Sequence, residues 1–228
     1  MNPVHTDSEL NPPPSVLEQL TVLAVIVAPA IALCYGVHLA WQQGGVDLFY
    51  LALAVLGYVF SGLGITVGFH RLFTHDSFKA KPVVTFAFAV LGCTAIQGTI
   101  LDWCGRHTVH HQKSDKEGDP HSPWKFGTGS LDLLKGYLHA HCLWIFREPA
   151  PEENGCIKRL KSDPVVMFVH KTTWLWILLG LTVPTVLGYV YSGTAYGAWL
   201  GFIWGGLVRV FIVQHVTWSV NSTVMCLG

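Results

Sequence analysis

The sequence predicts an all-α integral membrane protein with four transmembrane helices and a cytosolic helical cap. Of the 228 residues, 51% are hydrophobic and only 12% are charged, whereas a typical soluble domain has roughly 25% charged residues. Four apolar segments come close to the ~20 residues that a helix needs to cross the hydrocarbon core. The basic residues are concentrated in one stretch between the second and third of these segments. The formal net charge is zero, so nothing in the composition favours a nucleic-acid partner.

Each apolar segment has the composition of a membrane span. The first contains one proline and no charge, the second is uncharged and rich in glycine, and the fourth carries Arg209 near its end. In chain order the segments are 20–41, 48–69, 174–191 and 195–213. Short connections join the first to the second and the third to the fourth, which predicts two helical hairpins. Residues 1–19 are expected to be a disordered lead and 20–228 a single membrane domain.

A fifth uncharged run, residues 83–101, is shorter and more polar than the other four. It could span the membrane, lie in the interface or re-enter. If it crossed the bilayer, the histidines on either side of it would lie on opposite membrane faces. They could then not share a metal ion, so the path of this run decides whether a shared metal site is possible.

The distribution of positive charge predicts the orientation. Of the 14 Lys and Arg residues, 13 fall between Arg71 and Lys171. Because cytoplasmic loops carry an excess of Lys and Arg, residues 70–171 are expected to be cytoplasmic. Both termini would then be cytoplasmic as well.

Two histidine motifs flank the fifth run, and each follows an apolar segment. Box one, residues 70–75, has the sequence HRLFTH, and box two, residues 107–111, has the sequence HTVHH. On an α-helix the three histidines of box two would share one face, whereas His70 and His75 would be ~140° apart and flank a centre. Five imidazoles exceed what one closed tetrahedral zinc site uses. The set favours a two-metal site, with iron as the metal.

These motifs resemble those of the membrane fatty acyl-CoA desaturases, the stearoyl-CoA (delta-9) desaturase family. Residues 68–78, GFHRLFTHDSF, look like the family's first box. Residues 103–111 and the following 118–123, GDPHSP, are similar to the second box of its bacterial members. The resemblance runs from about residue 45 to 222. It implies four transmembrane helices, a cytosolic cap and two non-haem irons that use O2 to place a double bond, at the delta-9 position, in a long acyl chain.

The resemblance also implies roles for individual residues. Asn221 would lie near one iron through water, Asp119 and His121 would orient ligand imidazoles, and Thr99 and Trp103 would line an acyl tunnel. Asp119 and His121 could equally be ordinary polar residues of a loop. The expected iron ligands are His70, His75, His107, His110 and His111.

Three further histidines stay outside the expected metal set. His139 and His141 are interpreted as either structural or substrate-contacting. His215 ends the fourth apolar segment, six residues before Asn221, and is left out of the ligands.

The partners implied by the resemblance follow from the reaction. The substrate would be a long-chain acyl-CoA or acyl-lipid, and O2 would be the oxidant. The sequence has no flavin or nicotinamide motif, so electrons would come from a donor such as ferredoxin or from cytochrome b5 with a reductase.

The chain departs from the family pattern near its end. The family has a ligand histidine four residues after Asn221, where this sequence has Met225, and a third box is expected beyond Gly228. We therefore expect the 228-residue chain to be inactive or impaired. Two alternatives stay open: a membrane remnant that keeps the fold without chemistry, and a related di-iron hydroxylase.

Overall fold

The computed structural model describes residues 14–114, 116, 119, 121–147 and 150–224, and all regular structure in this part of the chain is helical. Met225 and most of the expected disordered lead lie outside it. In chain order the elements are α1 (Val16–Gln43), α2 (Leu48–Leu63), η2 (Gly64–Thr74), α3 (Pro82–Cys93), α4 (Ile100–Lys113), α5 (Ser130–His141), η3 (Leu143–Phe146), α6 (Gly155–Lys161), α7 (Pro164–Lys171), α8 (Thr173–Ser192), α9 (Ala195–Gly201), η4 (Phe202–Val208), α10 (Arg209–Ser219) and η5 (Val220–Val224). The segments η2, η4 and η5 are π-helical and η3 is a 3-10 helix.

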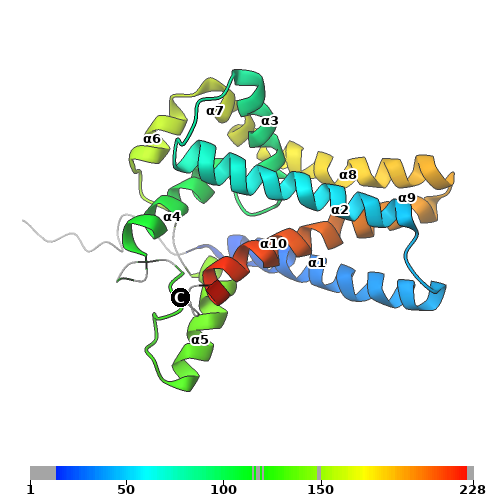
Figure 1. Ribbon diagram of the computed structural model, residues 1–228, viewed down its shortest axis with the longest axis horizontal. Helices are drawn as coiled ribbons and strands as arrows, with labels where there is room; N and C mark the ends of the chain where they lie inside the picture. The colour runs from blue at the N-terminus through cyan, green and yellow to red at the C-terminus, as the bar shows by residue number, and fades with distance from the viewer. Residues whose placement is uncertain (1–13, 115, 117–118, 120, 148–149, 225–228) are drawn as a thin grey trace, which may run out of the picture.

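Four continuous helices are long and apolar enough to cross a membrane, which confirms the predicted architecture. They are 28, 27, 20 and 29 residues long and comprise α1, α2 with η2, α8, and α9 through η5. At 1.5 Å per residue even the shortest reaches about 30 Å. In Figure 1 these helices run alongside one another, and α3 to α7 gather at one end of the bundle. We call this the histidine end, because both boxes lie there.

The first helix begins earlier than expected. Ser15 caps it, since its side chain accepts a hydrogen bond from the Glu18 amide while the Glu18 carboxylate accepts one from the Ser15 amide. This reciprocal capping box fixes a helix start by satisfying otherwise free amides. The expected lead of residues 1–19 therefore overlaps the first turn of α1.

The fourth span lies between the first and the second. The hairpin turn after α1 is tight, with Gly44 in the left-handed conformation at φ 75°, yet α1 and α2 each pack on η4. Gly36 permits this packing, because a Cβ there would lie 3.3 Å from the Trp204 ring. The α8–α9 hairpin is packed closely, with Gly188 and Gly201 at the seam. Small residues let helix backbones approach in membranes.

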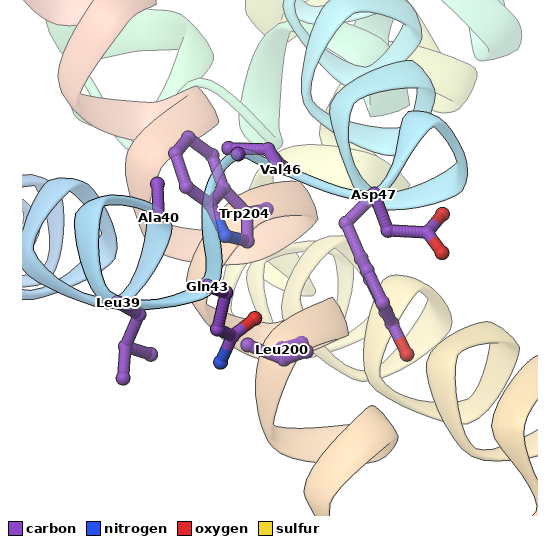
Figure 2. Close-up of a pocket in the computed structure, with 9 residues that line it drawn as sticks. Leu39, Ala40, Gln43, Val46, Asp47, Leu200 and Trp204 are labelled. Atoms are coloured by element: carbon purple, nitrogen blue, oxygen red, sulfur yellow. The ribbon is translucent and has the colours of Figure 1, made fainter.

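A small cavity lies at the end of the bundle opposite the histidines. It has a volume of about 20 Å³, and Figure 2 shows residues that line it, among them Gln43, Leu200 and Trp204. That volume has room for about one water molecule.

The fifth apolar run does not form one membrane-crossing helix. Helix α3 has 12 residues, which is about 18 Å and too short to cross. The chain breaks at residues 94–99 and reverses, with positive φ at Ile96 and Gly98. Helix α4 then returns beside η2, so the two boxes meet at one end of the bundle.

A buried apolar cluster joins the elements at the histidine end. Phe69 of η2, Ala89 of α3, Ile100 of α4 and Val169 of α7 are each 0% exposed. Leu160 of α6 completes the contact between these helices. This packing fixes the helices that carry the boxes against one another and excludes water from beneath them.

Candidate metal centre

Box one lies on a π-helix, and this changes the geometry expected from the sequence. The His75 amide donates to the His70 carbonyl across five residues at 3.1 Å. Because a π-helix closes its turn at i+5, His70 and His75 lie one above the other instead of ~140° apart. Their Nε2 atoms are 3.1 Å apart. The expectation that they flank a centre from different sides is corrected by the wider helix.

The widened helix has carbonyls that accept side-chain hydrogen bonds. The Phe69 carbonyl accepts from the Thr74 hydroxyl at 2.8 Å and from the Cys104 thiol at 3.4 Å. The Phe73 carbonyl accepts from the Cys156 thiol and from the Arg159 guanidinium. Side chains of α4 and α6 therefore support the backbone of box one.

Box two lies on α4, and its three histidine side chains point in two different directions. His107 and His111, four residues apart, face box one, and their Nε2 atoms are 2.9 Å apart. His110 points toward Asp119 instead. Successive residues on an α-helix are rotated by 100°, so His110 and His111 cannot both face the same centre. The single face expected for the three histidines is corrected in this respect.

Four imidazoles from the two boxes form one cluster. The His75–His111 Nε2 distance is 3.3 Å, which links the two pairs, and the four ligand atoms all lie within 4.8 Å of one another. Two imidazole nitrogens bound to one metal at about 2.1 Å lie roughly 2.9–3.4 Å apart at angles of 90–110°. The three short distances in this cluster fall in that range. The residues present therefore fit a metal ion with imidazole ligands.

A second group of possible metal ligands, His110, Asp119 and His121, is buried next to the four-imidazole cluster. The His110 Nδ1 atom is 3.0 Å and 3.1 Å from the two carboxylate oxygens of Asp119. Asp119 is 4% exposed and also accepts from the His121 amide at 3.1 Å. A carboxylate that accepts from one ring nitrogen directs the other nitrogen of a histidine toward a metal. This geometry fits the orienting role expected of Asp119.

The His121 ring packs against the His110 ring in a tilted arrangement, with ring centroids 4.2 Å apart. Its Nδ1 atom is 3.7 Å from Asp119, which is too long for a hydrogen bond. The residues His110, Asp119 and His121 nevertheless place three ligand atoms within 4.8 Å. This group can contribute to a second metal position, and His121 has ligand chemistry as well as the orienting role expected of it.

Three histidines of these groups, His107, His111 and His121, are held neutral by their surroundings. Burial, with a smaller contribution from neighbouring histidines, lowers the pKa of His107 from 6.5 to about 2 and that of His111 to about 4. Burial also lowers the pKa of His121 to about 3. Neutral imidazole is the form that binds metal, so the environment favours the ligand form over the whole physiological pH range.

The two expected tunnel residues lie at the start of α4, the helix that carries box two. Thr99 caps α4 by accepting from the Asp102 amide at 3.3 Å. The Trp103 ring stacks on His107 with centroids 4.6 Å apart, and its indole N–H donates to Gln97. The side-chain amide of Gln97 donates to Thr217 at 3.1 Å. Their role in a tunnel stays a prediction.

Asn221 lies on η5 and is half-buried. Within the described residues no hydrogen bond joins it to a histidine of either box. Its neighbour Ser222 instead bonds His141, which in turn bonds His215 at 2.9 Å. The pairing of His141 with His215 was not predicted, because the two residues are 74 positions apart and belong to no common motif. These hydrogen bonds connect α5 to the fourth span.

A larger cavity of about 480 Å³ opens beside box one, between η2, α6 and α7. Leu72, Phe73 and Val166 contribute to its apolar walls. Its two cations, Lys79 and Arg159, are close to Asp76, at 2.7 Å and 3.7 Å respectively. Because Asp163 also lines the cavity, two carboxylates stand against two cations and the charges of the cavity largely cancel.

The fold and site together define a helical membrane protein with an imidazole-rich cluster that fits a metal ion at one end of its bundle. Comparison with known proteins then identifies its family. The fatty acid desaturase family model matches residues 48–224. This chain belongs to the fatty acid desaturase family, whose members are oxidoreductases, as the sequence motifs predicted.

Curated relatives agree with this assignment. Hex-5-enoyl-[acyl-carrier protein] acetylenase of Moorena producens is 34% identical over 86% of this chain and 61% of its own length. A probable acyl-CoA desaturase of Schizosaccharomyces pombe is 30% identical over 93% of this chain and 41% of its own. The sn-1 stearoyl-lipid 9-desaturase of Anabaena variabilis is 33% identical over 81% of this chain and 60% of its own length. The chain thus spans less than two thirds of each of these relatives.

Proposed function

We propose that residues 48–224 form the membrane and metal-binding core of an O2-dependent fatty acyl desaturase that uses iron. The observation that carries the proposal is the meeting of His70, His75, His107 and His111 at one end of an apolar bundle, in a chain of the desaturase family. Iron bound there would supply the activation of O2 that removes two hydrogens from an acyl chain. The delta-9 position is supported by relatives such as the 9-desaturase of Anabaena variabilis.

The residues of the site have separable tasks in this proposal. The four clustered imidazoles bind one metal, and His110, held by Asp119, offers its Nε2 to a second. Asn221 would lie near one of the two irons through water. His121 packs on His110 and keeps the orientation of its ring.

The surroundings would exclude water from the reacting carbons. Trp103 covers His107 from the bundle side, and Phe69 and Ile100 are fully buried beneath the cluster. A long acyl chain would enter along this apolar side, with Thr99 and Trp103 on its path.

The partners follow from the chemistry. A long-chain acyl-CoA or acyl-lipid would be the substrate, because the relatives' names include both acyl-CoA and stearoyl-lipid desaturases. The electrons would be supplied by ferredoxin or by cytochrome b5 with a reductase. The positive charge between Arg71 and Lys171 supports a cytoplasmic location for the histidine end and for both termini.

Product analysis tests the proposal. The purified chain is loaded with Fe²⁺ in detergent and supplied with O2, reduced ferredoxin and a saturated acyl-CoA or acyl-lipid. Because Met225 stands where the family has a ligand histidine, mass spectrometry should detect at most a low yield of alkene. His107→Ala should abolish that product, and His38→Ala, at an exposed histidine of α1, should not. An alcohol in place of the alkene would favour the hydroxylase. Tight iron binding without any product would favour the remnant that keeps the fold alone.

A further inference from the structure

Arg209 is a buried cation within the fourth span, and its hydrogen bonds go to neutral oxygens. It is 2% exposed and begins α10. Its Nη1 atom donates to the Ser61 hydroxyl at 2.8 Å and to the Thr94 carbonyl at 2.6 Å, and Nη2 donates to the Gly180 carbonyl at 2.8 Å. One side chain thus joins α2, the end of α3, and α8 to α10. An ionisable residue at membrane depth is costly and marks a functional position.

The bundle is shaped around this guanidinium. A Cβ added at Gly57 would lie 3.0 Å from Arg209 Cγ, and one at Gly180 would lie 3.3 Å from Nη2. Both contacts are tighter than ordinary van der Waals packing. Helices α2 and α8 therefore carry glycine where the Arg209 side chain passes between them.

Arg209 and a second polar side chain of α10 hold the turn at residues 94–99. Gln214, 1% exposed, donates to the Ile96 carbonyl at 3.0 Å. Ile96 has φ 54°, a conformation that is strained for a β-branched residue. The Thr94 carbonyl lies at the C-terminal end of α3, where the helix dipole favours a cation. Two carbonyls of an irregular, membrane-depth turn thus receive their donors from α10, as backbone in an apolar environment requires.

The position of this turn decides where α4 begins. Helix α4 starts at Ile100, directly after the turn, and packs on η2 through Cys104, whose thiol contacts the Phe69 carbonyl. A shift of the turn would move the whole helix along η2. His107 and His111 would then lose their places opposite box one.

We propose that Arg209 and Gln214 are positioning residues that fix the 94–99 turn and thereby set box two at the depth of box one. They touch neither the imidazoles nor the acyl path, and they act through the turn and α4. The proposal rests on the proposed function only in treating the four clustered imidazoles as metal ligands.

The first readout needs no metal. Cys104 is fully buried between α4 and η2, so its reaction with a maleimide, followed by peptide mass spectrometry, reports loss of α4 docking. In Arg209→Met and Gln214→Met we expect Cys104 to react about tenfold faster, because local opening becomes easier when these hydrogen bonds are lost. Arg209→Lys should be intermediate. Gln43→Met, which removes an amide at the opposite end of the bundle, should leave the rate unchanged, and Cys142 serves as the internal reference.

The second readout is Co²⁺ affinity, which should fall about tenfold in the same two variants and not in Gln43→Met. Adding Ile96→Gly to Gln214→Met should slow Cys104 labelling again, because glycine adopts positive φ without strain. If Arg209→Met does not fold, Gln214→Met decides the outcome. Wild-type labelling rates in the folded variants would overturn the proposal. Failure of the wild-type chain to bind Co²⁺ would instead overturn the metal centre, while Cys104 labelling would still decide the positioning role.

Discussion

The Nε2 atoms of His75 and His111 lie 3.3 Å apart, although 36 residues and two changes of chain direction separate them. His75 ends a π-helix of the second span, and His111 lies near the end of α4. Their contact depends on the reversal at residues 94–99, which returns the chain to the end of the bundle that it had just left. The candidate metal centre is therefore a product of that turn.

Removal of one clustered imidazole should weaken metal binding strongly. For His107→Ala and His111→Ala we expect Co²⁺ affinity to fall by more than about 100-fold, because loss of a ligand should exceed the roughly 10- to 100-fold effect of losing an outer-shell partner. Titration of the cobalt absorption bands measures the affinity. His38→Ala is the matched control, and equal affinities for all three variants would contradict the four-imidazole site.

Asp119→Asn should affect the second metal position selectively. An amide cannot accept from His110 Nδ1 with the strength of a carboxylate, so the ring loses its fixed orientation and the affinity at that position should fall about 10- to 100-fold. Metal stoichiometry by mass spectrometry, measured with increasing free metal, separates the two positions. The exposed Glu152→Gln removes a similar charge elsewhere and should change neither. An equal loss at both positions would count against the assignment of His110 to a separate centre.

The metal-free protein should lose stability as the pH falls. The pKa of His107 is lowered to about 2 and that of His121 to about 3, against an ordinary value of 6.5. The unfolded chain therefore binds protons below pH 6.5 that the folded chain does not bind, and the free energy of unfolding decreases through that range. Thermal unfolding in detergent should give a Tm that is constant above pH 7 and lower at pH 5. A Tm that rises on acidification would refute the burial of neutral imidazoles.

Two nearby glycines of the second span should respond in opposite directions to alanine. A Cβ at Gly64 would overlap the backbone of Gly92 in α3, whereas one at Gly62 meets open space. Gly64→Ala should destabilise the protein by about 1–3 kcal/mol or more through overpacking. Gly62→Ala should stabilise it by roughly 0.5–1 kcal/mol through helix propensity. Thermal unfolding of the two variants side by side checks both signs, and similar Tm values would disprove the close α3–η2 contact.

The elements predicted best were those that depend on the average apolar composition of a long stretch of residues. The four spans follow from apolar runs of about 20 residues, and the extra length of α1 comes from a local capping box at Ser15 and Glu18. The boxes themselves were recognisable because a few histidines stood at helix ends. These signals are local, so neighbouring residues suffice to produce them.

The sequence by itself determined the all-helical membrane class, the desaturase family and the identity of the clustered histidines. Only the tertiary structure decided that His70 and His75 share one side of a π-helix, that His110 turns away to Asp119, and that Arg209 reaches Thr94. The physical reason for the first and the third is that they depend on hydrogen bonds between segments far apart in the chain. The His110–Asp119 contact joins residues nine positions apart and depends on the path of the loop after α4. In η2, the Phe69 and Phe73 carbonyls accept hydrogen bonds from side chains of α4 and α6. In the turn before α4, the Thr94 and Ile96 carbonyls accept hydrogen bonds from side chains of α10. Local propensity contains no information about which distant donor will be available.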